Sequence, residues 1–78
     1  MADNTNYRLD FKGAITSLAL LKLTRVFREM KSHETLEVSG VDAEARADMF
    51  RVLPAVDYDV TAMDRQEDAS YRIELKKR

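Results

Sequence analysis

In YRLDFKGAITSLALLKLTRVFREM, residues 7–30, the hydrophobic period changes from two residues to about 3.6. Apolar and polar residues alternate over residues 7–11, which predicts a half-buried strand. After Gly13 the apolar residues follow a three-and-four spacing, which predicts a helix over about residues 17–30. We expect the buried stripe of this helix to comprise Leu20, Leu23, Phe27 and Met30, with Ala19 and Val26 beside them.

Each predicted helix begins at a residue suited to capping its first turn. Thr16 precedes the first helix and Asp42 the second, and both side chains carry an oxygen that can accept from an unpaired amide. Pro54 ends the second helix, because proline lacks the amide hydrogen and disfavours helix at the residue before it. The buried stripe of the second helix is predicted to be Ala45, Met49, Val52 and Leu53.

Three further segments alternate as strands do. Residues 35–39 place Leu36 and Val38 on one face. The next segment has a predicted inward face of Val56, Tyr58, Val60 and Ala62, and an opposite face of Asp57, Asp59, Thr61 and Met63. The last segment has an inward face of Tyr71, Ile73 and Leu75.

The predicted order of elements is strand, helix, strand, helix, strand, strand. All four strands are half polar, so the sheet should have one covered face and one wet face. Right-handed crossovers place both helices on the same face. We therefore expect an α+β fold, a two-layer α/β sandwich with a four-stranded mixed sheet and two helices on one face. Residues 1–78 should form a single domain with a flexible N-terminus over residues 1–5.

Composition narrows the class of function. Thirteen basic and 14 acidic residues give a formal net charge of -1, which argues against nucleic-acid binding by phosphate neutralisation. No apolar run approaches the roughly 18 residues of a membrane span, and the polar residues 1–12 predict no signal peptide. The chain contains no cysteine, which excludes disulfides and thiolate metal sites. We expect a cytoplasmic protein that binds neither nucleic acid nor membrane.

The segment around the first helix resembles the TusA/SirA/YedF family of small sulfur-carrier proteins. The signature of that family is a strand, a glycine and a Cys-Pro-x-Pro motif at the helix start, followed by a hydrophobic residue, a leucine and a lysine. Gly13, Leu20, Leu21 and Lys22 stand where the signature requires them. The positions of the cysteine and the two prolines hold Thr16, Ser17 and Ala19 instead. The resemblance extends to the strands at residues 34–38 and 71–75, and it implies the same two-layer architecture.

The missing cysteine determines what this resemblance implies about function. Sulfur transfer as a persulfide needs a thiolate, and no other side chain of this sequence can supply one. We therefore expect a non-catalytic interaction or regulatory module that needs no cofactor. Its expected partner is a protein, either a cysteine-bearing redox protein or a component of a sulfur-trafficking complex. The predicted binding residues lie at the start of the first helix: Gly13, Thr16, Ser17, Leu18, Leu21, Lys22 and Arg25.

Other interpretations of this helix start stay open. Free amides and the positive end of the helix dipole could bind a small anion or metabolite beside the Thr16 and Ser17 hydroxyls. A third interpretation is sulfur transfer completed by the cysteine of a partner. Leu18 and Leu21 fall among cations and away from the buried stripe, so they could dock an acidic, partly apolar partner surface. Alternatively, they pack under the loop before the helix or are ordinary exposed leucines. If both leucines were buried under residues 12–15, the docking interpretation would fail.

The remaining polar clusters give weaker indications. His33 is the only histidine, and without cysteine or a paired carboxylate motif it predicts no metal site. The carboxylates of residues 57–68 lack the glycine and the regular oxygen spacing of a calcium loop. The outward positions of the strands carry no aromatic residue and mixed charge, which argues against RNA binding by base stacking.

Overall fold

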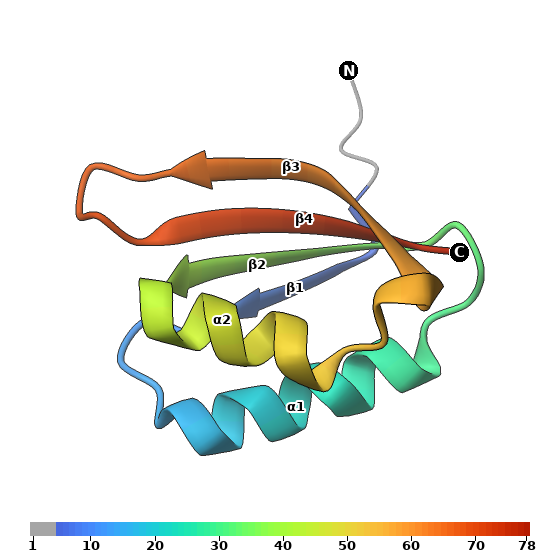
Figure 1. The fold of residues 1–78 in the computed structure, drawn as a ribbon, viewed down its shortest axis with the longest axis horizontal. Coiled ribbons are helices and arrows are strands. Elements are labelled where there is room, and N and C mark those ends of the chain that lie inside the picture. Colours follow the sequence, from blue (N-terminus) through green and yellow to red (C-terminus); the bar gives the residue numbers. More distant parts are fainter. Residues whose placement is uncertain (1–4) are drawn as a thin grey trace.

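The computed structural model describes residues 5–78 and confirms the predicted order of elements (Figure 1). The elements are β1 (Tyr7–Asp10), α1 (Thr16–Glu29), β2 (Thr35–Val41), α2 (Ala43–Val52), the 3-10 helix η1 (Ala55–Asp57), β3 (Tyr58–Arg65) and β4 (Tyr71–Lys77). The N-terminal segment that we expected to be flexible, residues 1–5, lies outside the described residues except for Thr5.

The four strands form one mixed sheet in the order β1-β2-β4-β3. β1 is parallel to β2, whereas β4 is antiparallel to both of its neighbours. Figure 1 shows α1 and α2 side by side on one face of this sheet. The α+β fold with two helices on one face is therefore confirmed, and the strand order leaves β1 and β3 at the two edges.

The core lies between the helices and the sheet. It combines the predicted stripe of α1 with the inward side chains of β2 and β4, because those positions share the helix-facing side of the sheet. The fully buried side chains are Leu23, Leu36, Val38, Val41, Met49, Ile73 and Leu75. No charged side chain of residues 5–78 is buried, so the core of the described chain is apolar throughout.

The opposite face of the sheet carries a row of ion pairs with one residue from each strand. The Arg8 Nε lies 3.2 Å from Glu37 Oε2, and the Arg72 Nη1 lies 2.6 Å from Glu37 Oε1. Arg72 also pairs with Asp64 on the edge strand β3. The predicted wet face is therefore charged, and these cations are neutralised by neighbouring carboxylates.

The predicted inward face of β3 is wrong beyond Val60, because the strand contains a bulge. Val60 lies opposite Leu75 in β4, but Ala62 lies opposite Glu74 and Met63 opposite Ile73, so Thr61 is an extra residue. One inserted residue reverses the alternation that follows it. Met63 thus faces the helices, where its sulfur lies 3.8 Å from Arg46 Nη1, and Ala62 faces the opposite side.

Two other valines predicted to be buried are exposed. Val56 lies in η1 rather than in a strand and is 76% exposed, because Pro54 starts a separate helical turn before β3 begins. Val52, at the end of α2, is 44% exposed. The buried stripe of α2 ends with Met49, and Leu53 continues it just beyond the helix.

The two helices begin differently, which corrects one predicted cap. Asp42 caps α2 as expected, since its carboxylate accepts a hydrogen bond from the Ala45 amide at 2.7 Å. Thr16 does not cap α1: the N-cap position is Ile15, which makes no side-chain cap bond, and Thr16 is already the first helical residue. The free amides of the first turn of α1 therefore receive no hydrogen bond from the Thr16 hydroxyl in the capping geometry.

This difference predicts unequal effects of truncation at the two helix starts. Asp42→Ala should lower the free energy of unfolding by about 1 kcal/mol, because it removes the cap of α2. Thr16→Ala should change it by less than about 0.5 kcal/mol, as expected for an exposed side chain that caps nothing. Urea denaturation of both variants checks the pair, and a larger loss from Thr16→Ala would contradict the assigned helix starts.

Candidate functional site

A tight turn carries the chain from β1 into α1. The Ala14 amide donates to the Phe11 carbonyl at 3.1 Å, and Gly13 between them has a φ of 74°, a conformation that glycine adopts without steric cost. The turn directs α1 back along the edge strand β1. All seven predicted binding residues are exposed, but they lie on two sides of the helix start.

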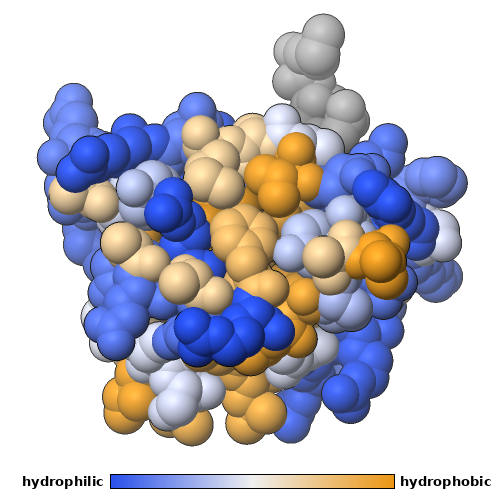
Figure 2. All heavy atoms as spheres, viewed as in Figure 1, coloured by the Kyte–Doolittle hydropathy of each residue, from blue (hydrophilic) through white to orange (hydrophobic). Residues whose placement is uncertain are grey.

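An apolar ridge runs along the exposed side of α1. We use this name for Ile15, Leu18 and Leu21, which are 66%, 60% and 59% exposed. Figure 2 shows hydrophobic atoms projecting along the lower edge of the molecule, over the N-terminal half of α1. Neither leucine is buried under residues 12–15, so the condition under which the docking interpretation would fail is not met, and docking stays a prediction. Ile15 was missed, although its three-residue spacing from Leu18 and Leu21 could have indicated it.

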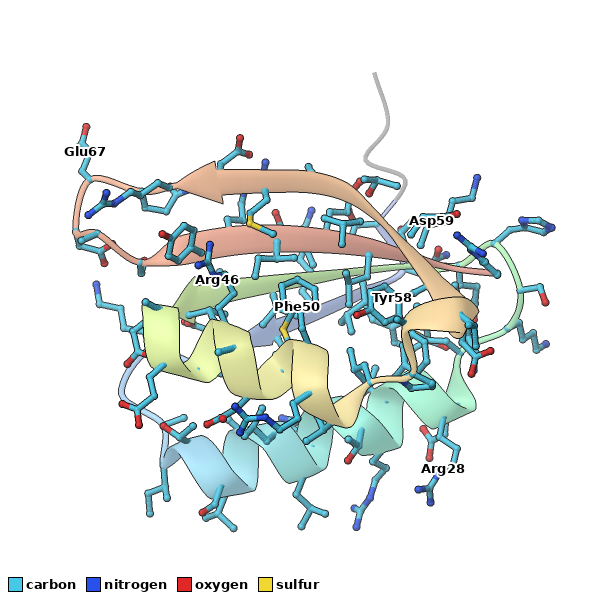
Figure 3. All side chains as sticks on the ribbon, viewed as in Figure 1. Arg28, Arg46, Phe50, Tyr58, Asp59 and Glu67 are labelled. Carbon is cyan, nitrogen blue, oxygen red and sulfur yellow. The ribbon has the colours of Figure 1, made fainter. Side chains whose placement is uncertain are left out.

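Lys22 and Arg25 lie beside this ridge, and Arg28 lies further along α1, in its last turn. Within residues 5–78, Lys22, Arg25 and Arg28 form no ion pair, in contrast to the paired arginines of the sheet. The helix itself offers no carboxylate before Glu29. Figure 3 shows Arg28 pointing away from the sheet. The side of the ridge that carries Lys22 and Arg25 is therefore positively charged without compensation by an ion pair, which favours an acidic ligand surface there.

A hollow of about 350 Å³ separates the ridge from β1. Most of its lining is apolar, and Leu18 belongs to both the ridge and the hollow. The lining residues are Leu9, Phe11, Ala14, Leu18 and Ala19, together with the charged residues Arg8, Asp10 and Lys22. The hollow gives one side of α1 a concave apolar surface that a protruding side chain can enter.

Thr16 and Ser17 face a different hollow, between the starts of the two helices. Its other lining residues include three carboxylates, from Asp42, Glu44 and Asp48. These negative charges oppose an anion at the start of α1, even though the helix dipole attracts one. The structure therefore weighs against the small-anion interpretation and does not place Thr16 and Ser17 on the same surface as Leu18 and Lys22.

The loop between β3 and β4 reaches the other side of the turn. Hydrogen bonds from the Ser70 side chain and amide, aided by the charge of Lys12 3.7 Å away, lower the pKa of Asp68 below its ordinary value. Asp68 and Thr16 line a third hollow together with Gly13 and Asp42. This loop brings another carboxylate near position 16, but Lys12, which lines the same hollow, pairs with it.

Neither a metal site nor a membrane span occurs among the described residues. Across residues 5–78, no three carboxylate or histidine side chains gather as a metal ion would require. His33 lies in the turn after α1 with a φ of 72°. Within the same residues, no helix combines the length and the hydrophobicity that a bilayer crossing needs.

The comparisons with known proteins add no assignment to this geometry. No protein-family model matches this sequence, and no curated protein matches it.

Proposed function

We propose that this chain is a non-catalytic docking module on a sulfur-carrier scaffold, which binds a protein partner through the start of α1. The observation that supports this function is the exposed apolar ridge, with Lys22 and Arg25 beside it and in no ion pair among residues 5–78. The contact residues are Leu18, Leu21, Lys22 and Arg25, with Thr16, Ser17 and the Gly13 turn at one border.

The ridge supplies the affinity of this interaction. Fully burying one leucine side chain is worth about 1.5–3 kcal/mol, so Leu18 and Leu21 together can anchor a partner. The cations contribute mainly to the choice of partner and to the association rate, because they attract an acidic surface and repel a basic one. An acidic protein with an apolar patch fits both features.

The proposed link to sulfur trafficking depends on position 16. In a sulfur carrier this position holds the reactive thiolate, whereas Thr16 offers an alcohol that cannot form a persulfide. A chain of this kind can still occupy the docking site that a carrier would use. We propose that it acts in the cytoplasm, where thiols stay reduced, and that it regulates a cysteine-bearing partner without accepting sulfur.

Photo-crosslinking in the source cell tests this function. Benzoylphenylalanine at Leu21 should capture a sulfur-trafficking or redox protein, because that side chain lies within the proposed interface. The same group at Val56, which is also exposed but lies in η1 beyond the far end of α2, should capture none of these proteins. Equal capture at both positions, or no protein of these classes at Leu21, would contradict the proposal.

A further inference from the structure

β1 has an outer edge with which no strand of the described chain pairs. The strand order places β1 at one end of the sheet, where β2 is its only neighbour among residues 5–78. Its pairing with β2 runs in unbroken register from Tyr7 opposite Leu36 to Asp10 opposite Ser39. β3, the other edge strand, contains the bulge at Thr61, which disturbs a pairing edge. β1 is therefore the more regular template for an added strand.

The apolar hollow lies directly beside this edge. It is lined by consecutive residues of β1 on one side and by Leu18, Ala19 and Lys22 of α1 on the other. Successive side chains of a strand point to opposite faces, so every second side chain of a strand added to β1 would point to the helix side. A large apolar side chain at such a position would enter the hollow and contact Leu18.

The charges around the hollow favour an acidic segment. Lys22 has no carboxylate partner in residues 5–78, whereas Arg8 is paired with Glu37 on the opposite face of the sheet. Among the described residues, Asp10 is the one carboxylate in the lining, and its Oδ1 accepts a hydrogen bond from the Lys12 amide at 2.9 Å. An acidic residue of the ligand can therefore pair with Lys22.

We infer that the bound element of the partner is an extended acidic segment that adds a strand to the free edge of β1. Main-chain hydrogen bonds to β1 supply part of the affinity, and one large apolar side chain in the hollow supplies selectivity. A carboxylate next to that side chain pairs with Lys22. This inference rests on the proposed function, since it specifies how a protein partner uses the same end of α1.

Selection from a phage library of random peptides tests the mode of binding. Clones enriched on the full chain should share a large apolar residue flanked by acidic residues in a strand-like alternation. Synthetic peptides from these clones should bind Leu18→Asp and Lys22→Glu more weakly, by about tenfold or more for Leu18→Asp. Val56→Asp, a matched control at an exposed apolar residue away from β1, should bind them as the original chain does.

A second set of peptides tests the added strand itself. Proline placed in turn at two adjacent central positions of an enriched peptide should abolish binding at one of them, because every second amide of an added strand pairs with β1. The NMR signals of backbone amides that shift on binding should map to residues 8–10 as well as to α1.

The inference is wrong if no clone is enriched, if the enriched peptides bind the Leu18→Asp variant as tightly as the original chain, or if the shifted amide signals avoid β1. Binding to phosphatidylserine vesicles that Leu18→Asp abolishes, without any peptide binding, would assign the surface to a membrane and overturn it.

The two proposals can fail separately. Peptide selection uses only the purified chain, so strand addition can be confirmed even if crosslinking at Leu21 recovers no sulfur or redox protein. Conversely, crosslinking can recover such a protein while the amides of β1 are unaffected by peptides. The first outcome would contradict the proposed function alone, and the second would contradict strand addition alone.

Discussion

Leu23→Ala is expected to lower the free energy of unfolding by about 2–5 kcal/mol. Leu23 is completely buried in the middle of α1, where it belongs to the core cluster shared with β2 and β4. Truncation removes apolar contacts and leaves a cavity that the close-packed surroundings fill only in part. For a small domain this loss is a large share of the total stability, so a clear fall in the urea midpoint should follow.

Leu21→Ala is the matched control on the same helix. Leu21 is 59% exposed, and the same truncation there should change the free energy of unfolding by less than about 0.5 kcal/mol. It should nevertheless weaken binding to the partner captured by crosslinking. Equal losses of stability from the two variants would mean that the ridge packs inside the protein, which would remove the basis of the docking surface.

Gly40→Ala should be the second strongly destabilising substitution, with a loss of about 2 kcal/mol or more. Gly40 has a φ of 68°, and a β-carbon there would lie 2.7 Å from the Lys12 backbone nitrogen and 2.8 Å from Asp10 Oδ1. These atoms form the turn after β1, which is tied by the hydrogen bond from the Lys12 amide to Asp10. An added methyl group must therefore push β2 away from the turn that leads into α1.

Gly13→Ala separates backbone strain from this steric conflict. Gly13 has a similar φ of 74°, but a β-carbon there would meet no atom within 4 Å. Its substitution should cost only about 1–2 kcal/mol, the cost of the left-handed conformation alone. Thermal unfolding of both variants gives the comparison. A loss from Gly13→Ala as large as that from Gly40→Ala would contradict the close approach at Gly40.

Hydrophobic periodicity predicted most of the fold. The three-and-four spacing in α1 identified Leu23, Phe27 and Met30 as buried, and strict alternation identified the inward faces of β2 and β4. These patterns are reliable because each element has one face toward a single core. The strand order was not predicted, because period alone does not determine which strands become neighbours.

The errors occur where one residue changes the local geometry. The extra residue at Thr61 reverses the faces of Ala62 and Met63, and nothing in the alternation of residues 58–65 marks it. Threonine suits the N-cap role, so the sequence predicts the cap of α1 at Thr16. In the structure Ile15 occupies the N-cap position and Thr16 is the first residue of the helix. Such shifts depend on tertiary packing, which overrides a local preference.

The candidate site was predicted only in part. The exposed leucines could be identified from helical spacing, because Leu18 and Leu21 fall outside the buried stripe. The hollow beside β1 could not be predicted, since it depends on how closely α1 approaches the edge strand. The carboxylates near Thr16 come from α2 and its N-cap, which are distant in the sequence, and only the folded chain brings Asp42, Glu44 and Asp48 to that helix start.

Transfer of sulfur from a cysteine desulfurase tests most directly whether this chain is a carrier scaffold without its reactive atom. The chain and its Thr16→Cys variant would each be incubated with the enzyme and radioactively labelled cysteine, and protein-bound sulfur would be measured before and after reduction. We predict no reducible label on the original chain and a reducible label on Thr16→Cys, whose exposed thiol would lie at the first turn of α1. Reducible sulfur on the original chain, or a Thr16→Cys variant that accepts none, would contradict the account.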